Sequence, residues 1–260
     1  LRADVDNLGT TFVHGFKRGD DDKYVTLSRT AALSRQLSLF FKGYINKILD
    51  DNTESLFSDG KSRKVVIVYS GGDDVFIAGA WNDVISSYMD LRTALDKFTI
   101  GALTISGGIG VYTPSYPISV MAEETQVLED ISKEVDGKDA ITLWNEDHCY
   151  KWSEFIDKVV GEKMQALKEY FDNNESRGMS FLYHLTDLLR NYKEQINIAR
   201  YVYLLSRMEP DEKCEDEVKE KYRMFSEKMY RWSQEETDRR ELITAIYLYV
   251  YLNREQKEDE

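Results

Sequence analysis

Residues 69–74 read Tyr69-Ser70-Gly71-Gly72-Asp73-Asp74, and they lie between two short apolar runs. The first run is Val65-Val66-Ile67-Val68, and the second is Val75-Phe76-Ile77-Ala78. Both are rich in β-branched or aromatic residues, so each run predicts a β-strand. The Gly-Gly pair supplies the backbone freedom that a tight hairpin turn requires. The stretch therefore predicts a β-hairpin that presents two adjacent carboxylates at its tip.

The adjacent carboxylates of Asp73 and Asp74 predict a cation site. Two acids side by side repel each other, and removing them from water adds to the cost. A divalent cation would offset both terms. A solvated acidic turn is the alternative interpretation, because Gly-Gly-Asp-Asp by itself is a short motif.

A second acidic segment opens the chain, where Arg2-Ala3-Asp4-Val5-Asp6 predicts a short strand. Residues two apart in a strand point to the same face, so we expect Asp4 and Asp6 to share a face. Asn7-Leu8-Gly9 is then expected to turn the chain. The alternative is an edge strand whose acids are solvated.

Composition limits the class of protein. The chain has 260 residues, of which 42% are hydrophobic and 31% charged, as in folded globular proteins. Its net charge of −13 argues against generic duplex binding, although a local basic groove or binding within a larger assembly stays possible. Two cysteines, Cys149 and Cys214, suit a reducing, cytoplasmic compartment. Because the chain opens at Leu1 inside an apparent strand, we expect it to be part of a longer polypeptide.

The order of elements up to Val111 predicts an α+β fold. Helical spacing of apolar residues predicts helices over 28–49, with Ser28 as N-cap, and over 81–98. Residues 103–111 predict a strand whose glycines indicate close approach by a ligand or a packed helix. A helix over 118–134 and a strand over 140–144 are expected to follow. The order β-α-β-β-α-β is the ferredoxin-like arrangement, with one antiparallel sheet and two helices on one face. That topology places the first strand beside the hairpin, so Asp4 should meet Asp73 and Asp74.

Residues 151–260 have helical patterns only, and they predict a bundle of four or five helices. We therefore expect two domains, 1–150 and 151–260. The aromatic stripes of the second domain are more typical of a helical core than of a ligand site. Its exposed faces are candidate docking surfaces, with Arg190, Arg200 and Arg207 as possible contacts.

Three segments of the first domain resemble a known family. Asp4-Val5-Asp6-Asn7-Leu8-Gly9, Tyr69–Asp74 and Ser106-Gly107-Gly108-Ile109-Gly110 look like the second palm domain of the large subunit of type III-A CRISPR–Cas (Csm) effector complexes. The helical remainder, including Gly178-Met179-Ser180-Phe181-Leu182-Tyr183-His184-Leu185, looks like that subunit's C-terminal domain. The order of the Asp-bearing strands also resembles nucleotide-polymerising palms and GGDEF cyclases.

The resemblance implies synthesis of cyclic oligoadenylate from ATP, switched on by target RNA. It implies Mg²⁺ or Mn²⁺ held by Asp4, Asp73 and Asp74, with Asp6 as a weaker candidate and the hairpin acids as the catalytic pair. The nucleotide contacts expected around these acids are Val5, Asn7, Leu8, Gly9, Ser70, Gly71, Gly72 and Ser106. By analogy with GGDEF cyclases, Lys133 or Lys138 is expected to meet phosphates; both could instead be ordinary surface lysines.

The resemblance also implies partners. These are the other subunits of the effector complex, including the small helical subunit, and the guide and target RNA. A first palm domain of the same polypeptide would complete a composite site. The HD nuclease domain of such subunits is not found in this sequence, which contains no His-Asp dipeptide.

Two other functions stay open. The chain could be another nucleotide cyclase of GGDEF type, although its Asp-Asp ending and appended bundle weigh against this. It could also be a non-catalytic scaffold that docks small subunits and lies along a guide–target duplex, although its intact acids weigh against a degenerate palm.

Overall fold

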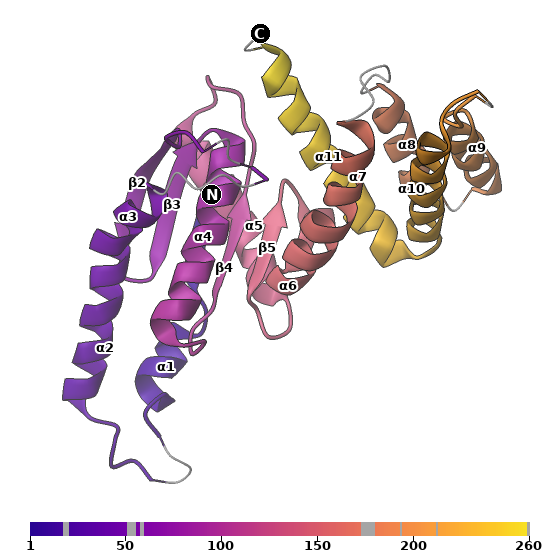
Figure 1. The fold of residues 1–260 in the computed structure, drawn as a ribbon. Helices are drawn as coiled ribbons and strands as arrows, with labels where there is room; N and C mark the ends of the chain where they lie inside the picture. The colour runs from indigo at the N-terminus through magenta and orange to yellow at the C-terminus, as the bar shows by residue number, and fades with distance from the viewer. Residues whose placement is uncertain are drawn as a thin grey trace. The chain divides into compact units, whose positions relative to one another are not determined.

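A computed structural model describes most of the chain (Figure 1). The described residues are 1–17, 21–50, 56–57, 60–172, 180–192, 194–211 and 213–258. Parts of the expected loops over 15–27 and 50–63, and Gly178-Met179 of the family resemblance, lie outside them. No helix in these described ranges is both long enough and apolar enough to cross a membrane. The chain divides into two compact units, Leu1–Trp152 and Ser153–Glu260.

The first unit is built on one mixed sheet with the strand order β2-β3-β1-β4-β5-β6. Its strands are β1 (Arg2–Val5), β2 (Val65–Gly71), β3 (Asp74–Gly79), β4 (Ile105–Ile109), β5 (Ala140–Leu143) and β6 (Cys149–Lys151). Its helices are α1 (Leu8–His14), α2 (Leu27–Leu39), a π-helical turn (Phe40–Tyr44), α3 (Ile45–Leu49), α4 (Trp81–Thr99), α5 (Ile118–Glu134) and a 3₁₀ turn (Glu146–His148).

The strand pairing confirms the ferredoxin-like prediction. β1 is antiparallel to both β3 and β4, and β2 pairs with β3 as a hairpin. The first strand therefore lies beside the hairpin, as the β-α-β-β-α-β order predicts. β5 adds parallel to β4, and β6 extends the sheet antiparallel to β5.

Helices cover both faces of this sheet. The two helical segments of the β-α-β-β-α-β unit, 27–49 and α4, pack together on one face, as predicted, and α5 adds a helix on the other face. A Cβ on Gly107 would lie 2.6 Å from the Tyr88 hydroxyl of α4, on the face where Ala3 is buried. A Cβ on Gly108 would lie 2.3 Å from the Cβ of Leu128 in α5, on the opposite face. The glycines of β4 thus permit helix packing on each side, which confirms the expected close approach.

Four local predictions differ from the structure. The hairpin loop is Gly72-Asp73 rather than Gly71-Gly72, because Gly71 pairs with Asp74; Gly72 has the positive φ (74°) that its position in the loop requires. Asn7 is left-handed and starts helix α1, where only a turn was expected. Thr26, not Ser28, caps α2. Lys151 belongs to strand β6, which was missed because three residues carry too little pattern to detect.

The regular elements described in the second unit are all helices. Its elements are α6 (Trp152–Glu154, beginning at the last residue of the first unit), a π-helical segment (Phe155–Met164), α7 (Gln165–Phe171), α8 (Ser180–Arg190), α9 (Gln195–Ser206), α10 (Asp216–Gln234) and α11 (Glu236–Glu258). Aromatic residues of the predicted stripes pack in its core, and the rings of Tyr170 and Phe225 stack at 4.1 Å, although Tyr203 is exposed. Lys163 is fully buried between Asp238 and Glu241. Arg190, Arg200 and Arg207 are exposed.

Candidate functional site

Two of the predicted acids face each other across neighbouring strands. Asp4 of β1 and Asp74 of β3 are directly opposite in the antiparallel register. Opposite residues share a face of the sheet, and like charges in such positions destabilise it. Asp73 lies beside them in the hairpin loop, and its carbonyl accepts a hydrogen bond (3.1 Å) from the Val5 N–H. The structure therefore brings the first strand and the hairpin acids to one place.

The pKa of the Asp73 carboxyl reports this crowding. It is raised above its usual 3.8 by burial, and then by the negative charges of Asp4 and Asp74. The negative charge of Asp74 likewise raises the pKa of the Tyr69 hydroxyl. The site thus concentrates negative charge, which is the electrostatic condition that a bound cation relieves.

Lys133 supplies positive charge to these acids from α5. Its Nζ donates to Asp4 Oδ2 and to Glu129 Oε1, both at 2.6 Å. Burial opposes its charge, but the hydrogen bonds to Asp4 and Glu129 outweigh this and raise the pKa of Lys133. Arg2 joins the network through Glu129, with Nε 3.2 Å from Oε2. One predicted phosphate-binding lysine is therefore engaged with a predicted metal ligand.

The donor set of Asp4, Asp73 and Asp74 fits a hard divalent cation in its chemistry, because Mg²⁺ prefers carboxylate oxygens. It is not preassembled. Within the described ranges, no three His, Cys, Asp or Glu side chains are grouped so that they could hold a metal ion. In this arrangement Lys133 neutralises Asp4 through an ion pair of 2.6 Å.

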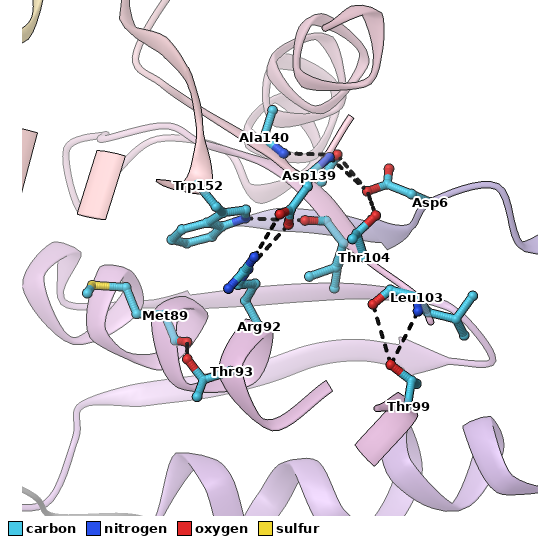
Figure 2. Close-up of polar contacts among 12 residues, drawn as sticks. Asp6, Met89, Arg92, Thr93, Thr99, Leu103, Thr104, Asp139, Ala140 and Trp152 are labelled. Carbon is cyan, nitrogen blue, oxygen red and sulfur yellow. Dashed lines mark hydrogen bonds and ion pairs between the residues drawn. The ribbon is translucent and has the colours of Figure 1, made fainter. Parts of the chain in front are cut away.

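Asp6 has a different environment from Asp4. It is 3% exposed, and its Oδ2 accepts hydrogen bonds from Thr104 Oγ1 (2.8 Å), Ser106 Oγ (3.0 Å) and the Asp139 N–H (3.2 Å). Its Oδ1 is buried without a hydrogen-bond partner in the described structure. Figure 2 shows Asp6 joining Thr104, which precedes β4, to Asp139, which precedes β5. The carboxylate thus ties together three segments of backbone.

The predicted nucleotide contacts divide into two groups. Asn7 and Gly9 are exposed at the start of α1, no side chain caps that helix, and nothing lies within 4 Å of a Cβ placed on Gly9. Gly71 and Gly72 are half-buried beside Asp73, and Lys138 is half-buried in the segment before β5. These residues are accessible for the role that was predicted.

The remaining predicted contacts are engaged elsewhere. Ser70 donates to the Phe41 carbonyl on the opposite face of the sheet, because it pairs with Val75 rather than with Asp74. Ser106 is fully buried against Asp6. The Val5 N–H is used by Asp73, and the side chains of Val5 and Leu8 are buried. Ser106 is opposite Asp4 and shares its face of the sheet, but it is buried there, and the side chains of Ser70 and Val5 point to the other face.

Several residues of this region were missed by sequence reasoning. Tyr69 lies on the same face as Asp74, to which its hydroxyl is hydrogen bonded, and its ring covers Gly71. Tyr69 could have been identified from the sequence, because residues two apart in a strand share a face and Tyr69 is two residues before Gly71. Glu129 could have been found as the i−4 neighbour of Lys133. Arg92 and Asp139 are 47 residues apart in the sequence, and no local sequence pattern predicts their ion pair.

A ferredoxin-like sheet with acids on its first strand and central hairpin defines a palm domain. The family model described as Cas10/Cmr2, second palm domain, matches residues 1–142. The model described as CRISPR RNA silencing complex Cmr2 subunit, second helical domain, matches residues 168–255. The chain belongs to the Cas10/Cmr2 family, as the sequence motifs predicted.

Its curated relatives are Cas10/Csm1 proteins of subtype III-A, each called a CRISPR system single-strand-specific deoxyribonuclease. The protein from Mycobacterium tuberculosis is 42% identical over 262 residues, covering 100% of this chain and 32% of the relative. The protein from Enterococcus italicus is 44% identical over 255 residues, covering 98% of this chain and 30% of the relative. The chain thus spans about a third of the length of these relatives.

Solved structures share the fold at low identity. Csm1 of T. onnurineus aligns with a TM-score of 0.69 and 20% identity, covering 96% of this chain and 36% of that one. A Csm1–Csm4 cassette in complex with cA4 aligns with a TM-score of 0.65 and 21% identity, covering 96% of this chain and 36% of that one. A Csm1–Csm4 cassette in complex with one ATP aligns with a TM-score of 0.64 and 23% identity, covering 94% of this chain and 35% of that one. These likenesses confirm the palm and helical architecture.

Proposed function

We propose that this chain carries the catalytic palm of a cyclic oligoadenylate synthase, which acts within a type III-A CRISPR effector complex and is switched on by target RNA. The observation that carries the proposal is the register that sets Asp4 directly opposite Asp74, with Asp73 in the adjoining loop. The cA3, cA4 and ATP complexes of structurally similar Csm1–Csm4 cassettes support the choice of ATP and of a cyclic adenylate product.

The reaction joins two molecules of ATP. The 3′-oxygen of one ATP bonds to the α-phosphorus of another, pyrophosphate leaves with the electrons of the broken P–O bond, and the hydroxyl proton passes to solvent. A pair of Mg²⁺ or Mn²⁺ ions, when bound, would activate the hydroxyl and neutralise the charge of the leaving group. Asp4, Asp73 and Asp74 are the residues that would hold them.

The chain's other groups position the nucleotide. The uncapped backbone N–H groups at the start of α1, next to Asn7, can donate to phosphate oxygens, since turn amides form anion-binding concavities. Gly72 leaves room beside the acids, whereas the Tyr69 ring occupies the space over Gly71. Lys133 is bonded to both Asp4 and Glu129; if a divalent cation replaced it at Asp4, it would keep the Glu129 contact and could offer its charge to a phosphate. We assign Asp6 to backbone support, because one of its oxygens already accepts three hydrogen bonds.

The partners and the helical unit belong to the same proposal. A first palm domain elsewhere in the polypeptide would complete the composite site, and the other subunits and the guide and target RNA would be bound through the complex. Csm1–Csm4 structures support subunit assembly for those proteins. The exposed Arg200 on α9 and Arg207 at its C-cap are candidate contacts for acidic partners or RNA.

The test replaces both hairpin acids in the full-length protein within its assembled complex. The Asp73→Ala/Asp74→Ala variant should form no cyclic oligoadenylate from ATP and Mg²⁺ in the presence of target RNA, while the complex assembles as in the wild type. Product is measured by chromatography of labelled ATP, with GTP run separately to test a GGDEF-type alternative. Unchanged product in the double variant would contradict the proposal, as would GTP conversion in place of ATP.

A further inference from the structure

The segment that enters β5 has an unusual backbone. Gly137, Lys138 and Asp139 are three consecutive residues with positive φ, at 76°, 54° and 50°. Glycine adopts such angles readily, but Lys138 and Asp139 carry side chains that disfavour them. Non-glycine residues persist in such conformations only when their surroundings impose them, and these conformations cluster at functional sites.

Four contacts hold this conformation. The Lys138 N–H donates to the Val135 carbonyl at 2.8 Å, and the other three act on Asp139. The guanidinium of Arg92 on α4 donates to both carboxylate oxygens, with Nε–Oδ1 at 3.2 Å and Nη2–Oδ2 at 2.7 Å. The Asp139 N–H donates to Asp6 Oδ2, and the Asp139 carbonyl accepts from the Trp152 N–H at 2.9 Å. Figure 2 shows Asp139 held in this way between Arg92 and Asp6.

The held segment is adjacent to the acidic site. Asp6 is two residues beyond Asp4, so the Asp139–Asp6 hydrogen bond fixes Lys138 relative to the end of β1 that bears the predicted metal ligands. Lys138 is half-buried, and it has no ion-pair partner in the part of the chain that the structure describes. Lys133, in contrast, is engaged with Asp4 and Glu129.

We propose that Arg92 is a positioning residue: through Asp139, and together with Asp6, it holds the left-handed Gly137–Asp139 segment so that Lys138 faces the phosphates of the bound nucleotide. The inference rests on the proposed function, because it requires ATP to bind at the acids. Arg92 itself touches no substrate. Its side chain is a planar fork that suits a bidentate carboxylate, which a lysine cannot reproduce.

A simpler role for the Arg92–Asp139 pair is to hold α4 against the sheet. The two roles predict different couplings. If Arg92 acts through Lys138, its loss should matter only while Lys138 is present. If it merely stabilises the fold, the effects of the two substitutions should multiply.

The test is a double-mutant cycle on ATP binding in the full-length protein within its complex. Lys138→Met should raise the dissociation constant of ATP about tenfold, the size expected for one lost hydrogen bond to a charged group. Arg92→Met should have a similar effect, and the double variant should be no weaker than Lys138→Met alone. Arg35→Met, which removes an exposed arginine from α2, is the matched control and should bind ATP as the wild type does.

Arg92→Lys keeps the positive charge, and it serves as a second variant in case Arg92→Met does not fold. It should weaken ATP binding less than Arg92→Met does, and it should leave the melting temperature close to that of the wild type. Wild-type affinity in both Arg92 variants, or multiplied effects in the cycle, would overturn the inference and leave the proposed function standing. A wild-type complex that neither binds nor converts ATP would overturn the proposed function itself.

Discussion

The Asp73 carboxyl shows how a single residue can be costly to the metal-free fold. It lies in the hairpin loop, where burial and the charges of Asp4 and Asp74 raise its pKa above 3.8. Because the pKa of this carboxyl is higher in the folded than in the unfolded protein, its protonation favours folding at pH values below the unfolded-state pKa. This contribution to the free energy of unfolding is lost as the pH rises through the folded-state pKa. At neutral pH the ionised Asp73 therefore disfavours the metal-free fold.

Asp73→Asn should raise the melting temperature of the metal-free protein at pH 7. The gain should shrink as the pH approaches 4, because the wild-type carboxyl becomes protonated and resembles the amide. With Mg²⁺ and ATP present the order should reverse, since the amide is a poorer ligand. Thermal unfolding at a series of pH values measures this, and Asp130→Asn on the exposed side of α5 serves as control. A metal-free wild type that melts above Asp73→Asn at pH 7 would refute the electrostatic argument.

At the scale of elements, the contact of β4 with α5 sets the position of Lys133. A Cβ on Gly108 would lie 2.3 Å from Leu128 Cβ and 2.6 Å from the Glu129 backbone nitrogen. Backbone atoms cannot yield as a flexible side chain can. A larger residue at this position must therefore move α5, and with it Glu129 and Lys133, away from Asp4.

Gly108→Ala should destabilise the protein by roughly 1–3 kcal/mol, the usual cost of overpacking a core, and lower the rate of product formation. Gly43→Ala is the control, because nothing lies within 4 Å of a Cβ there. It should change stability by less than about 0.5 kcal/mol or improve it slightly. The midpoint of urea unfolding and the rate of ATP conversion are the two measurements. Equal stability of the two variants would contradict the packing argument.

Elements with a clear period could be predicted from the sequence, and elements without one could not. The 81–98 and 118–134 patterns gave α4 and α5 nearly to the residue. Helix α1 was missed because its seven residues follow a left-handed Asn7 and include Gly9. The β-α-β-β-α-β order predicted that Asp4 would meet the hairpin, and the register confirms that Asp4 lies opposite Asp74. The sequence could not predict which side-chain oxygens are free to bind a ligand, because the hydrogen bonds of Ser70, Ser106 and Asp6 depend on tertiary contacts.

At the scale of the whole molecule, each unit has its own core and its own buried ion pairs. In the second unit, Lys163 is paired with Asp238 and Glu241, and removing one member of such a set leaves buried charge uncompensated. In the first, the acids and Lys133 form an open cluster. The proposed composite site needs a further palm domain, so the central claim must be tested in the full-length protein.

The most direct test is a structure of the full-length protein in its complex with ATP and Mn²⁺, with an anomalous difference map. We expect manganese peaks about 2.1 Å from carboxylate oxygens of Asp4 and of Asp73 or Asp74, close to the distance typical of Mg²⁺. Lys133 should have left Asp4 while it stays bonded to Glu129. Manganese bound away from these three acids, or a Lys133–Asp4 ion pair that persists beside bound ATP, would contradict the account.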